Sequence, residues 1–316
     1  MNVLLVGGAG FIGLHLAQQL IENHGANVTV LDDFSRGHDR DSVLHLVGPQ
    51  LRYLDLTLSD YLALNHSEEY DYIYHLAAIV GVSNVIEKPT ETLVGNIMLV
   101  KQVVELASRS PNLKNLVFFS TSEVYAGKLK TGGIDFPTLE STDLVVPQDY
   151  HPRDSYFLSK IIGEALLTYS DLPIVILRPH NFYGPRMGFS HVIPELMVKF
   201  RMAGDNPVVV ANSQHTRCFY YISDAIKDVI GVALSCNDGS IFNVGQNTEE
   251  LSMFSLSELI ADLTGFKGEI IEASDSVASP PRRVPDVSKI RSLLPRDDRV
   301  PIEEGLVQCW QWYSER

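Results

Sequence analysis

Short apolar runs alternate with amphipathic stretches from residue 2 to residue 177. The apolar runs have the length and composition of buried strands and cover Asn2–Val6, Asn27–Leu31, Leu51–Leu54, Tyr72–Leu76, Leu116–Ser120 and Ile174–Leu177. Apolar residues recur at helical spacing in the stretches His15–Glu22, Leu93–Ser108 and Ser155–Tyr169. Because strands that alternate with helices form parallel pairs, this order predicts an α/β fold with a doubly wound parallel sheet covered on both faces.

The pattern changes after Arg178-Pro179, where Pro and Gly become more frequent. Short helices are predicted near Val192–Met202, Asp224–Leu234 and Leu256–Leu263. No linker rich in Pro, Gly or Ser separates two independent domains, so the second part must pack closely with the first.

These changes predict the domain organisation. We expect a first domain over residues 1–178, to which residues 220–245 return, and a smaller α/β lobe over residues 179–316. Within the returning segment, Tyr220–Ala233 and Ile241–Val244 are expected to rejoin the sheet.

A glycine-rich turn, Gly7-Gly8-Ala9-Gly10-Phe11-Ile12-Gly13, follows the first apolar run and leads into the first helical stretch. In such a turn, backbone N–H groups and the positive end of the helix dipole can hold a pyrophosphate. Glycine turns also join strands to helices for steric reasons alone, so this signal is weak by itself. The residues predicted to contact a dinucleotide are Gly7, Gly10, Phe11, Ile12 and Gly13.

An acidic pair at the end of the second run strengthens this prediction. Asp32 lies about twenty residues beyond the glycines, where Rossmann-type folds carry a carboxylate that accepts hydrogen bonds from the adenosine ribose. A carboxylate there would repel a 2′-phosphate, so NAD is the expected cofactor. Arg36 nearby leaves NADP as the alternative cofactor. Asp33, Ser35 and Arg36 are also expected to contact the cofactor.

Composition narrows the possible partners. The chain has 316 residues, of which 45% are hydrophobic, so it can bury a large core. Its formal net charge of −14 argues against nucleic acid or an anionic membrane as a partner of the whole surface. Phosphate groups must therefore be held by local features such as the glycine turn.

The cysteines and the apolar segments predict the cellular location of the protein. Cys218, Cys236 and Cys309 are far apart and lack metal-type spacing, so we interpret them as small buried hydrophobic residues in a reducing cytoplasm. The N-terminal apolar run is short and lacks a basic leader, which favours a core strand over a signal peptide. No apolar stretch is long enough to span a membrane.

The middle of the chain carries a candidate catalytic pair. The strand at Leu116–Phe119 is followed by small polar residues, and Tyr156 and Lys160 lie four residues apart on one predicted helix face. An ammonium beside a phenol favours the phenolate, which makes tyrosine a general base for a hydroxyl proton. The same spacing occurs on solvated helix faces, so the glycine turn and the preceding strand decide in favour of catalysis.

In these motifs the chain resembles the nucleotide-sugar epimerases, dehydratases and decarboxylases of the extended short-chain dehydrogenases, over nearly all of its length. The resemblance implies a Rossmann fold with tightly held NAD, and Tyr156 with Lys160 as the catalytic pair, both in contact with the cofactor. It assigns the adenine side to Asp55 and Leu56. The contacts implied near the nicotinamide ribose are Leu76, Ala77, Ala78 and Asn96.

The resemblance also implies a nucleotide-diphosphate sugar as substrate, held mainly by the second lobe. Arg283 matches an arginine of glucuronate decarboxylases near the sugar carboxylate or the diphosphate, and a guanidinium can bind either group bidentately. His191 has no partner at metal spacing, so a pocket wall or polar surface is expected and no metal site is predicted. The expected substrate contacts are Ser83, Asn181, Arg186, His191, Val192, Arg217 and Arg283.

Members of this family share a first step and differ in the second. The resemblance implies that Tyr156 takes the proton of the sugar C4 hydroxyl while NAD takes the C4 hydride, which leaves a 4-keto sugar. Epimerases then return hydride to the other face, 4,6-dehydratases eliminate water across C5 and C6, and glucuronate decarboxylases lose the C6 carboxylate as carbon dioxide. Residues near C5 and C6 therefore decide the reaction.

The segment Thr121-Ser122-Glu123 separates these reactions. The 4-epimerases usually carry small neutral residues there, whereas dehydratases and decarboxylases resemble this chain in having a glutamate, which can act as a base at C5 or steer protonation. Ser122 replaces an aspartic acid of dTDP-glucose dehydratases, which counts against that activity. The alternative is a strand-end glutamate that only faces solvent or caps the next turn.

We therefore predict Thr121, Ser122 and Glu123 as catalytic residues of a UDP-glucuronate decarboxylase or a 4,6-dehydratase, with a 4-epimerase as the alternative. The helices predicted around Leu93–Leu106 and Ser155–Tyr169 carry apolar residues on more than one face. In the family the equivalent pair forms a four-helix interface, so the resemblance implies a homodimer. Helices that only cover the sheet are the alternative.

Overall fold

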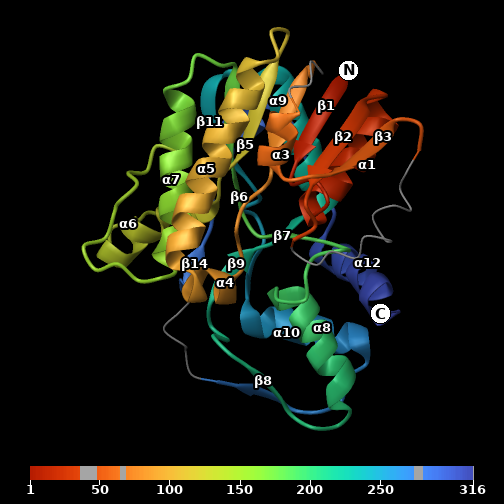
Figure 1. The fold of residues 1–316 in the computed structure, drawn as a ribbon. Coiled ribbons are helices and arrows are strands. Elements are labelled where there is room, and N and C mark those ends of the chain that lie inside the picture. The colour runs from red at the N-terminus through yellow and green to blue at the C-terminus, as the bar shows by residue number, and fades with distance from the viewer. Residues whose placement is uncertain (36–47, 65–68, 274–279, 316) are drawn as a thin grey trace. The chain divides into compact units, whose positions relative to one another are not determined.

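A seven-stranded sheet forms the centre of the first of two compact units (Figure 1). The computed structural model describes residues 1–35, 48–64, 69–273 and 280–315. The first unit comprises Met1–Gly132, Asp143–Pro179 and Ile226–Phe242, and the second comprises Gly133–Thr142, His180–Ala225 and Asn243–Arg316. The assignment of residues 1–178 to NAD and of residues 179–316 mainly to substrate stays a prediction.

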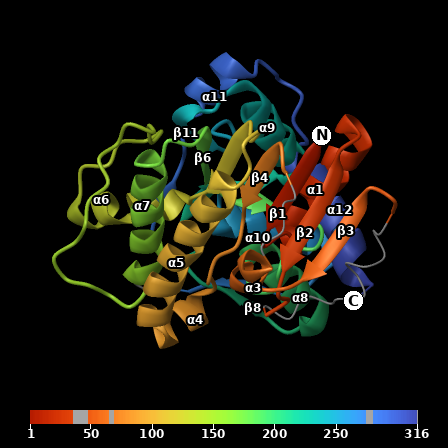
Figure 2. The same ribbon diagram turned by 45° about the horizontal axis from the view of Figure 1, so that its top comes forward.

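The sheet has the strand order β11, β6, β5, β4, β1, β2, β3. In that order the strands cover Asp238–Val244, Ile174–Pro179, Asn115–Phe119, Tyr72–His75, Asn2–Val6, Asn27–Asp32 and Leu51–Asp55. The neighbours from β3 to β6 pair in parallel, and Val3 lies opposite both Val28 and Tyr72. The chain adds β2 and β3 on one side of β1 and β4 to β6 on the other (Figure 2). Ligands of such sheets bind at the carboxyl ends of the strands where this order reverses, here between β1 and β4.

Seven helices of the described residues lie wholly in the first unit, and the longer ones cover the sheet. They are α1 (Phe11–His24), α3 (Leu58–Ala63), α4 (Val82–Glu87), α5 (Pro89–Ser108), the 3-10 helix η1 (Ser122–Tyr125), α6 (Ala126–Thr131) and α7 (Asp154–Thr168). In both views α5 and α7 lie side by side (Figures 1 and 2). The core between the sheet and α3, α5 and α7 includes Leu4, Ile73, Val103, Phe118 and Leu167. Burying each such side chain contributes about 1.5–3 kcal/mol to folding.

Small sheets and helices build the second unit. β7 (Phe182–Tyr183) pairs with β10 (Tyr220–Tyr221), β9 (Thr216–Cys218) lies between β12 (Glu250–Ser252) and β14 (Arg282–Arg283), and β8 (Val208–Val210) pairs with β13 (Ile270–Glu272). The helices are α8 (Val192–Ala203), α10 (Met253–Thr264), α11 (Ser288–Leu293) and α12 (Ile302–Ser314), while α9 (Ile222–Ser235) begins here and continues in the first unit.

The predicted strands up to Leu177 agree with β1 to β6 within one or two residues, and β1 agrees at both ends. The return of Ile241–Val244 to the sheet is confirmed by β11. The return of Tyr220–Ala233 as part of the sheet is wrong, because Tyr220–Tyr221 pairs with β7 in a separate sheet and Ile222–Ser235 is a helix. The apolar residues there recur at helical spacing, and only two residues remain for a strand.

Several apolar side chains are exposed on the α5 and α7 pair. Val94 and Met98 on α5, and Ile162 on α7, are 53%, 44% and 39% exposed. A second copy of the chain packed on α5 and α7 would cover these side chains. The homodimer stays a prediction. Within the described ranges, no helix combines the length and the apolar character that crossing a bilayer requires.

Candidate active site

The glycine turn after β1 is too crowded for side chains. Gly7 has a φ of 76°, and a Cβ on it would lie 2.5 Å from the backbone N and Cα of Ala77. A Cβ on Gly13 would lie 2.3 Å from the carbonyl oxygen of Gly8. The Gly7 N–H donates to the Leu31 carbonyl at 2.8 Å. The turn therefore contacts the carboxyl end of β2 through Leu31 and the residues just after β4 through Ala77.

Asp32 holds the same turn through its side chain. Its carboxylate oxygens accept the N–H groups of Ala9 and Phe34, both at 2.9 Å. Each oxygen has a second lone pair, so Asp32 can also accept a ribose hydroxyl. The first turn of α1 carries no acidic residue, and its N-cap Gly10 makes no side-chain capping bond. The N–H groups and the dipole of α1 therefore suit an anion such as a pyrophosphate.

Gly7→Ala is expected to weaken NAD binding strongly, because the new Cβ forces the turn and Ala77 apart. Gly25→Ala is the matched control: Gly25 has a φ of 59°, but no heavy atom lies within 4 Å of a Cβ there. Each change carries a left-handed backbone cost of about 1 kcal/mol. Isothermal titration calorimetry with NAD measures the affinity of each variant for the cofactor. Equal affinity of both variants for NAD would contradict the role of the turn.

The loop after β4 is held by Asn96 of α5. The N–H groups of Leu76 and Ala77 both donate to the Val6 carbonyl at 2.8 Å. The Asn96 side chain accepts the Ile79 N–H at 2.7 Å and donates to the Ile79 carbonyl and to Ser159 Oγ, both at 3.1 Å. Because Ser159 belongs to α7, Asn96 ties this loop to the helix that carries the candidate catalytic pair.

The other predicted cofactor contacts lie at strand ends of the first unit. Asp33 Oδ1 accepts the Ser35 N–H at 3.0 Å, whereas Arg36 lies outside the described residues. Asp55 ends β3, and Leu56 packs against the core beside it. Ser83, predicted to contact substrate, lies exposed on α4.

Lys160 is buried on α7, one turn after Tyr156. Its ammonium donates to the Phe119 carbonyl at 2.7 Å and lies 4.9 Å from the centroid of the Phe118 ring and 6.0 Å from that of Tyr156. Burial lowers the pKa of Lys160 to about 7, and the negative charge of Glu164 opposes this shift. The structure therefore places a cation that titrates near neutrality beside the tyrosine ring.

His75, at the end of β4, is a second buried titratable group near this lysine. Burial, with a smaller contribution from Lys160, lowers the pKa of His75 to about 3. Its ring stacks on Phe118 with centroids 5.8 Å apart. His75 is therefore neutral at physiological pH and adds no second positive charge.

The lowered pKa of Lys160 predicts a pH dependence of stability. Between about pH 7 and pH 10.5 the unfolded chain keeps the Lys160 proton while the folded chain has lost it, so the free energy of unfolding rises with pH in this window. Lys160→Met removes the titrating group and should remove this part of the rise. Urea unfolding of both proteins at several pH values measures the difference. Identical pH profiles would contradict the shift.

A buried ion pair lies one turn further along α7. Glu164 accepts Arg178 Nε at 3.0 Å and Arg178 Nη2 at 2.6 Å. Ser120 Oγ donates to the same carboxylate at 2.5 Å, and Arg178 Nη1 donates to the Tyr125 hydroxyl at 2.8 Å. Glu164 and Arg178 are both buried. The network joins α7 to β6, to the end of β5 and to η1.

Glu164→Gln is expected to lower the free energy of unfolding by about 3–5 kcal/mol, because it leaves the buried Arg178 charge without compensation. Glu195→Gln breaks an ion pair of equal length, 2.6 Å, with Lys199, but both side chains there are about half exposed. That control should cost at most about 1 kcal/mol. Urea unfolding compares the two variants. Equal losses of stability would show that burial does not set the cost.

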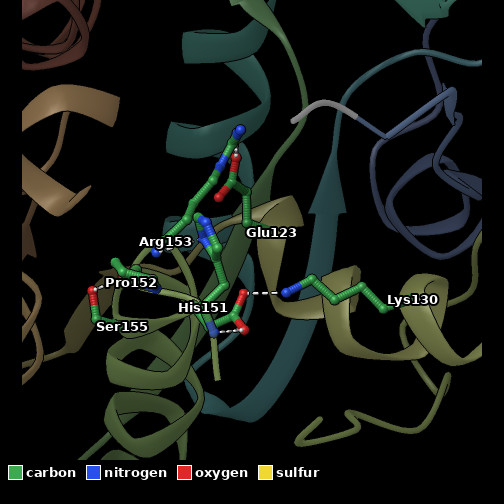
Figure 3. A network of polar contacts seen from close by, with 7 residues as sticks. Glu123, Lys130, His151, Pro152, Arg153 and Ser155 are labelled. Atoms are coloured by element: carbon green, nitrogen blue, oxygen red, sulfur yellow. Dashed lines mark hydrogen bonds and ion pairs between the residues drawn. The ribbon is translucent and has the colours of Figure 1, made fainter. Parts of the chain in front are cut away.

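Glu123 lies in η1, directly after β5. Thr121 supplies the side-chain cap of this turn, since its Oγ1 accepts the Glu123 N–H at 3.2 Å. Glu123 Oε1 accepts a hydrogen bond from Arg153 Nη2 at 3.2 Å (Figure 3). The Glu123 side chain is only 19% exposed, and Ser122 beside it is buried. These contacts argue against a glutamate that simply faces solvent.

Sequence reasoning missed Arg153. Thirty residues separate it from Glu123, so no local pattern joins the two. A cation three residues before Tyr156 at the start of a helix is the signal that could have drawn attention to it.

In the second unit, two predicted substrate arginines are neighbours. Arg217 of β9 and Arg283 of β14 are register partners in a parallel pair. Partnered residues of adjacent strands project from the same face. The Arg217 guanidinium donates to the carbonyls of Thr216 at 2.6 Å and Pro280 at 2.7 Å, which orient it. Two positive charges are therefore concentrated on one face of this sheet.

The other predicted substrate residues lie in the loop between β6 and α8 or at its end. Asn181 and Arg186 have φ angles of 43° and 69°. Asn181 Nδ2 donates to the carbonyl of Cys218 in β9 at 3.2 Å. His191 precedes α8, of which Val192 is the first residue. Across the residues that the structure describes, no group of three or more His, Cys, Asp or Glu could hold a metal ion.

Comparison with protein families gives one extended match. Residues 3–245 match the NAD dependent epimerase/dehydratase family. The match includes the glycine turn, Glu123 and the pair Tyr156 and Lys160.

Curated relatives match over almost the whole chain. UDP-N-acetyl-alpha-D-glucosaminuronate decarboxylase of Bacillus cytotoxicus is 31% identical over 99% of this chain and 97% of its own length. UDP-glucuronic acid decarboxylase 1 of Xenopus tropicalis is 31% identical over 99% of this chain and 72% of its own length.

Solved structures agree on the fold. The dTDP-glucose 4,6-dehydratase DesIV of Streptomyces venezuelae, solved with NAD and TYD bound, is 25% identical with a TM-score of 0.85, covering 100% of this chain and 97% of that one. The UDP-glucuronic acid 4-epimerase of Bacillus cereus, solved with UDP-glucuronic acid and NAD, is 25% identical with a TM-score of 0.79, covering 100% and 99%.

Proposed function

Because the chain belongs to the NAD-dependent epimerase/dehydratase family, we propose that it oxidises a nucleotide-diphosphate sugar at C4 and then acts at C5 and C6, as a uronate decarboxylase. A sugar 4,6-dehydratase is the second candidate. It shares the fold and the NAD chemistry of DesIV, while Ser122 counts against dTDP-glucose itself as the substrate. The observation that carries the proposal is Glu123, a partly buried carboxylate in the same unit as Tyr156 and Lys160.

NAD is the cofactor of this family, and it supplies the oxidation and the later reduction of the sugar. The residues of the first unit fit it. Gly7 leaves no room for a Cβ, the first turn of α1 is without acidic residues, and Asp32 can accept ribose hydroxyls. Lys160 would hold the nicotinamide ribose, and Asn96 fixes the neighbouring loop.

Tyr156 takes the proton of the C4 hydroxyl in the first step. Lys160 faces its ring, and the positive charge favours the phenolate form that accepts the proton. The Tyr156 carbonyl accepts a hydrogen bond from Ser159 Oγ at 2.6 Å, and Asn96 donates to that same Oγ. The helix turn that presents Tyr156 is thereby fixed before substrate binds.

The 4-keto group weakens the bonds at the neighbouring carbon C5. In a uronate, the C5–C6 bond breaks, its electron pair moves into the C4 enolate, and carbon dioxide leaves. A proton then adds to C5. In a 4,6-dehydratase, a base removes the C5 proton, and the C6 hydroxyl receives a proton and leaves as water. In either reaction Glu123 is proposed to control the proton at C5.

Arg217 and Arg283 are proposed to bind the diphosphate or the sugar carboxylate. Their positions on paired strands place two guanidinium groups on one face, and each group can bind an oxyanion through two donors. Asn181, Arg186, His191 and Val192 are proposed to contact the same substrate. We also propose a homodimer through α5 and α7, whose exposed apolar side chains would be covered.

A substrate panel tests the proposed reaction. The purified protein is incubated with UDP-, GDP-, CDP- and dTDP-sugars, including UDP-glucuronate and UDP-N-acetylglucosaminuronate, and product masses are recorded. Loss of carbon dioxide from a uronate is the expected result. Loss of water would assign the 4,6-dehydratase, and a product of unchanged mass would assign a 4-epimerase and overturn the proposal.

A further inference from the structure

Two ion pairs of opposite polarity join the segment that carries Glu123 to the start of α7 (Figure 3). Glu123 pairs with Arg153, and Lys130 pairs with Asp154. Glu123 and Lys130 belong to the continuous segment η1 and α6, while Arg153 and Asp154 are adjacent. We propose that Arg153 is a positioning residue, which holds the Glu123 carboxylate in place for the step after C4 oxidation. This inference rests on the proposed function.

The backbone that presents Arg153 is fixed by local hydrogen bonds. Asp154 is buried, and its Oδ2 accepts the His151 N–H at 3.0 Å. The Arg153 N–H donates to His151 Nδ1 at 3.2 Å. Ser155 Oγ donates to the Pro152 carbonyl at 2.8 Å. The Arg153 guanidinium therefore extends toward Glu123 from a rigid turn.

The segment on the other side is equally constrained. Thr121 caps η1, and α6 follows it without a break. A Cβ on Gly127 of α6 would lie 1.7 Å from the Val145 carbonyl oxygen, so α6 packs directly on the chain that leads to α7. Because both partners start from fixed backbones, little freedom is lost when Arg153 and Glu123 meet.

The pair has two chemical consequences. A guanidinium 3.2 Å from a carboxylate favours the charged, oriented form of that carboxylate. Arg153 also lies three residues before Tyr156, so one helix start positions both the base of the first step and the partner of Glu123. The start of α7 therefore sets the positions of both Tyr156 and the cation that holds Glu123.

Removing the positioning cation should slow the second step selectively. Arg153→Gln is expected to lower kcat by about 10- to 100-fold, as misplacement of a reacting group does, with little change in KM. The 4-keto sugar should accumulate, as it should when Glu123 itself is changed. Arg153→Lys keeps the charge but not the planar fork, so part of kcat should return.

A double-mutant cycle tests whether Arg153 acts through Glu123. In a Glu123→Gln background, Arg153→Gln should cause no further loss of kcat, because the carboxylate to be positioned is already gone. Losses that multiply would mean that Arg153 acts independently of Glu123, and would overturn the inference. Lys114→Gln is the matched control, since it breaks an ion pair with Asp71 at 3.0 Å at the amino ends of β4 and β5. It should leave kcat unchanged.

The same measurements separate this inference from the proposed function. If Glu123→Gln forms product normally, the proposed function fails. If Glu123→Gln is blocked while Arg153→Gln turns over at the wild-type rate, only the positioning role fails. If Arg153→Gln does not fold, Arg153→Lys carries the test. Full loss of kcat in Arg153→Lys without accumulation of the 4-keto sugar would then contradict the inference.

Discussion

The Tyr156→Phe variant is expected to fold and bind NAD like the wild type while its turnover falls by about 10²- to 10⁴-fold. The substitution removes the phenolic oxygen that accepts the C4 hydroxyl proton, and keeps the ring that faces Lys160. Product formation from the substrate identified in the panel gives the turnover, and thermal unfolding with and without NAD checks fold and binding.

A Tyr156→Phe protein that converts its substrate at nearly the wild-type rate would show that another group is the base. A protein that loses turnover only because it no longer binds NAD would also fail the prediction. Phe157→Leu is a useful neighbour control, because Phe157 is buried on the same helix and its change should affect stability first.

The Glu123→Gln variant is expected to complete the oxidation at C4 and stop there. Glutamine keeps the shape of the side chain but can neither hold nor release a proton, so the step at C5 is blocked. The 4-keto sugar should accumulate, and final product should form only at a small residual rate. Product masses and the absorbance of reduced NAD, followed in the same reaction, measure both effects.

Normal product formation by Glu123→Gln would remove the decarboxylase and the dehydratase together and favour a 4-epimerase. Inversion at C4 needs only a rotation of the keto sugar, so no second acid or base is required. The structural role of Glu123 is not at issue in this test, because glutamine can still accept the Arg153 hydrogen bond seen at 3.2 Å.

Local sequence patterns were sufficient for much of the fold. The run Asn2–Val6 became β1 without a change at either end, because a short apolar segment that ends directly at a glycine turn has few other structures open to it. The small sheets of the second unit were missed, since strands such as Arg282–Arg283 are set by register with β9 rather than by their own composition. Tyr220–Tyr221 was misplaced for the same reason.

Some features of the candidate site could be predicted from the sequence, and others could not. The glycine turn, Asp32 and the pair Tyr156 and Lys160 have spacings that sequence reasoning can find, because one strand, turn or helix presents them. The contacts of Glu123 with Arg153 and of Glu164 with Arg178 join different elements. Burial of Lys160, which moves its titration toward neutrality, also depends on the surrounding elements and leaves no mark in the sequence.

Trapping the 4-keto sugar tests the central claim most directly. Wild-type turnover of the accepted nucleotide sugar is quenched with sodium borodeuteride, which reduces a ketone and leaves deuterium on the carbon that carried it. The account predicts deuterium at C4 of the recovered sugar, at a higher level in the Glu123→Gln reaction. Product formation with no deuterium at C4 in either reaction would contradict it.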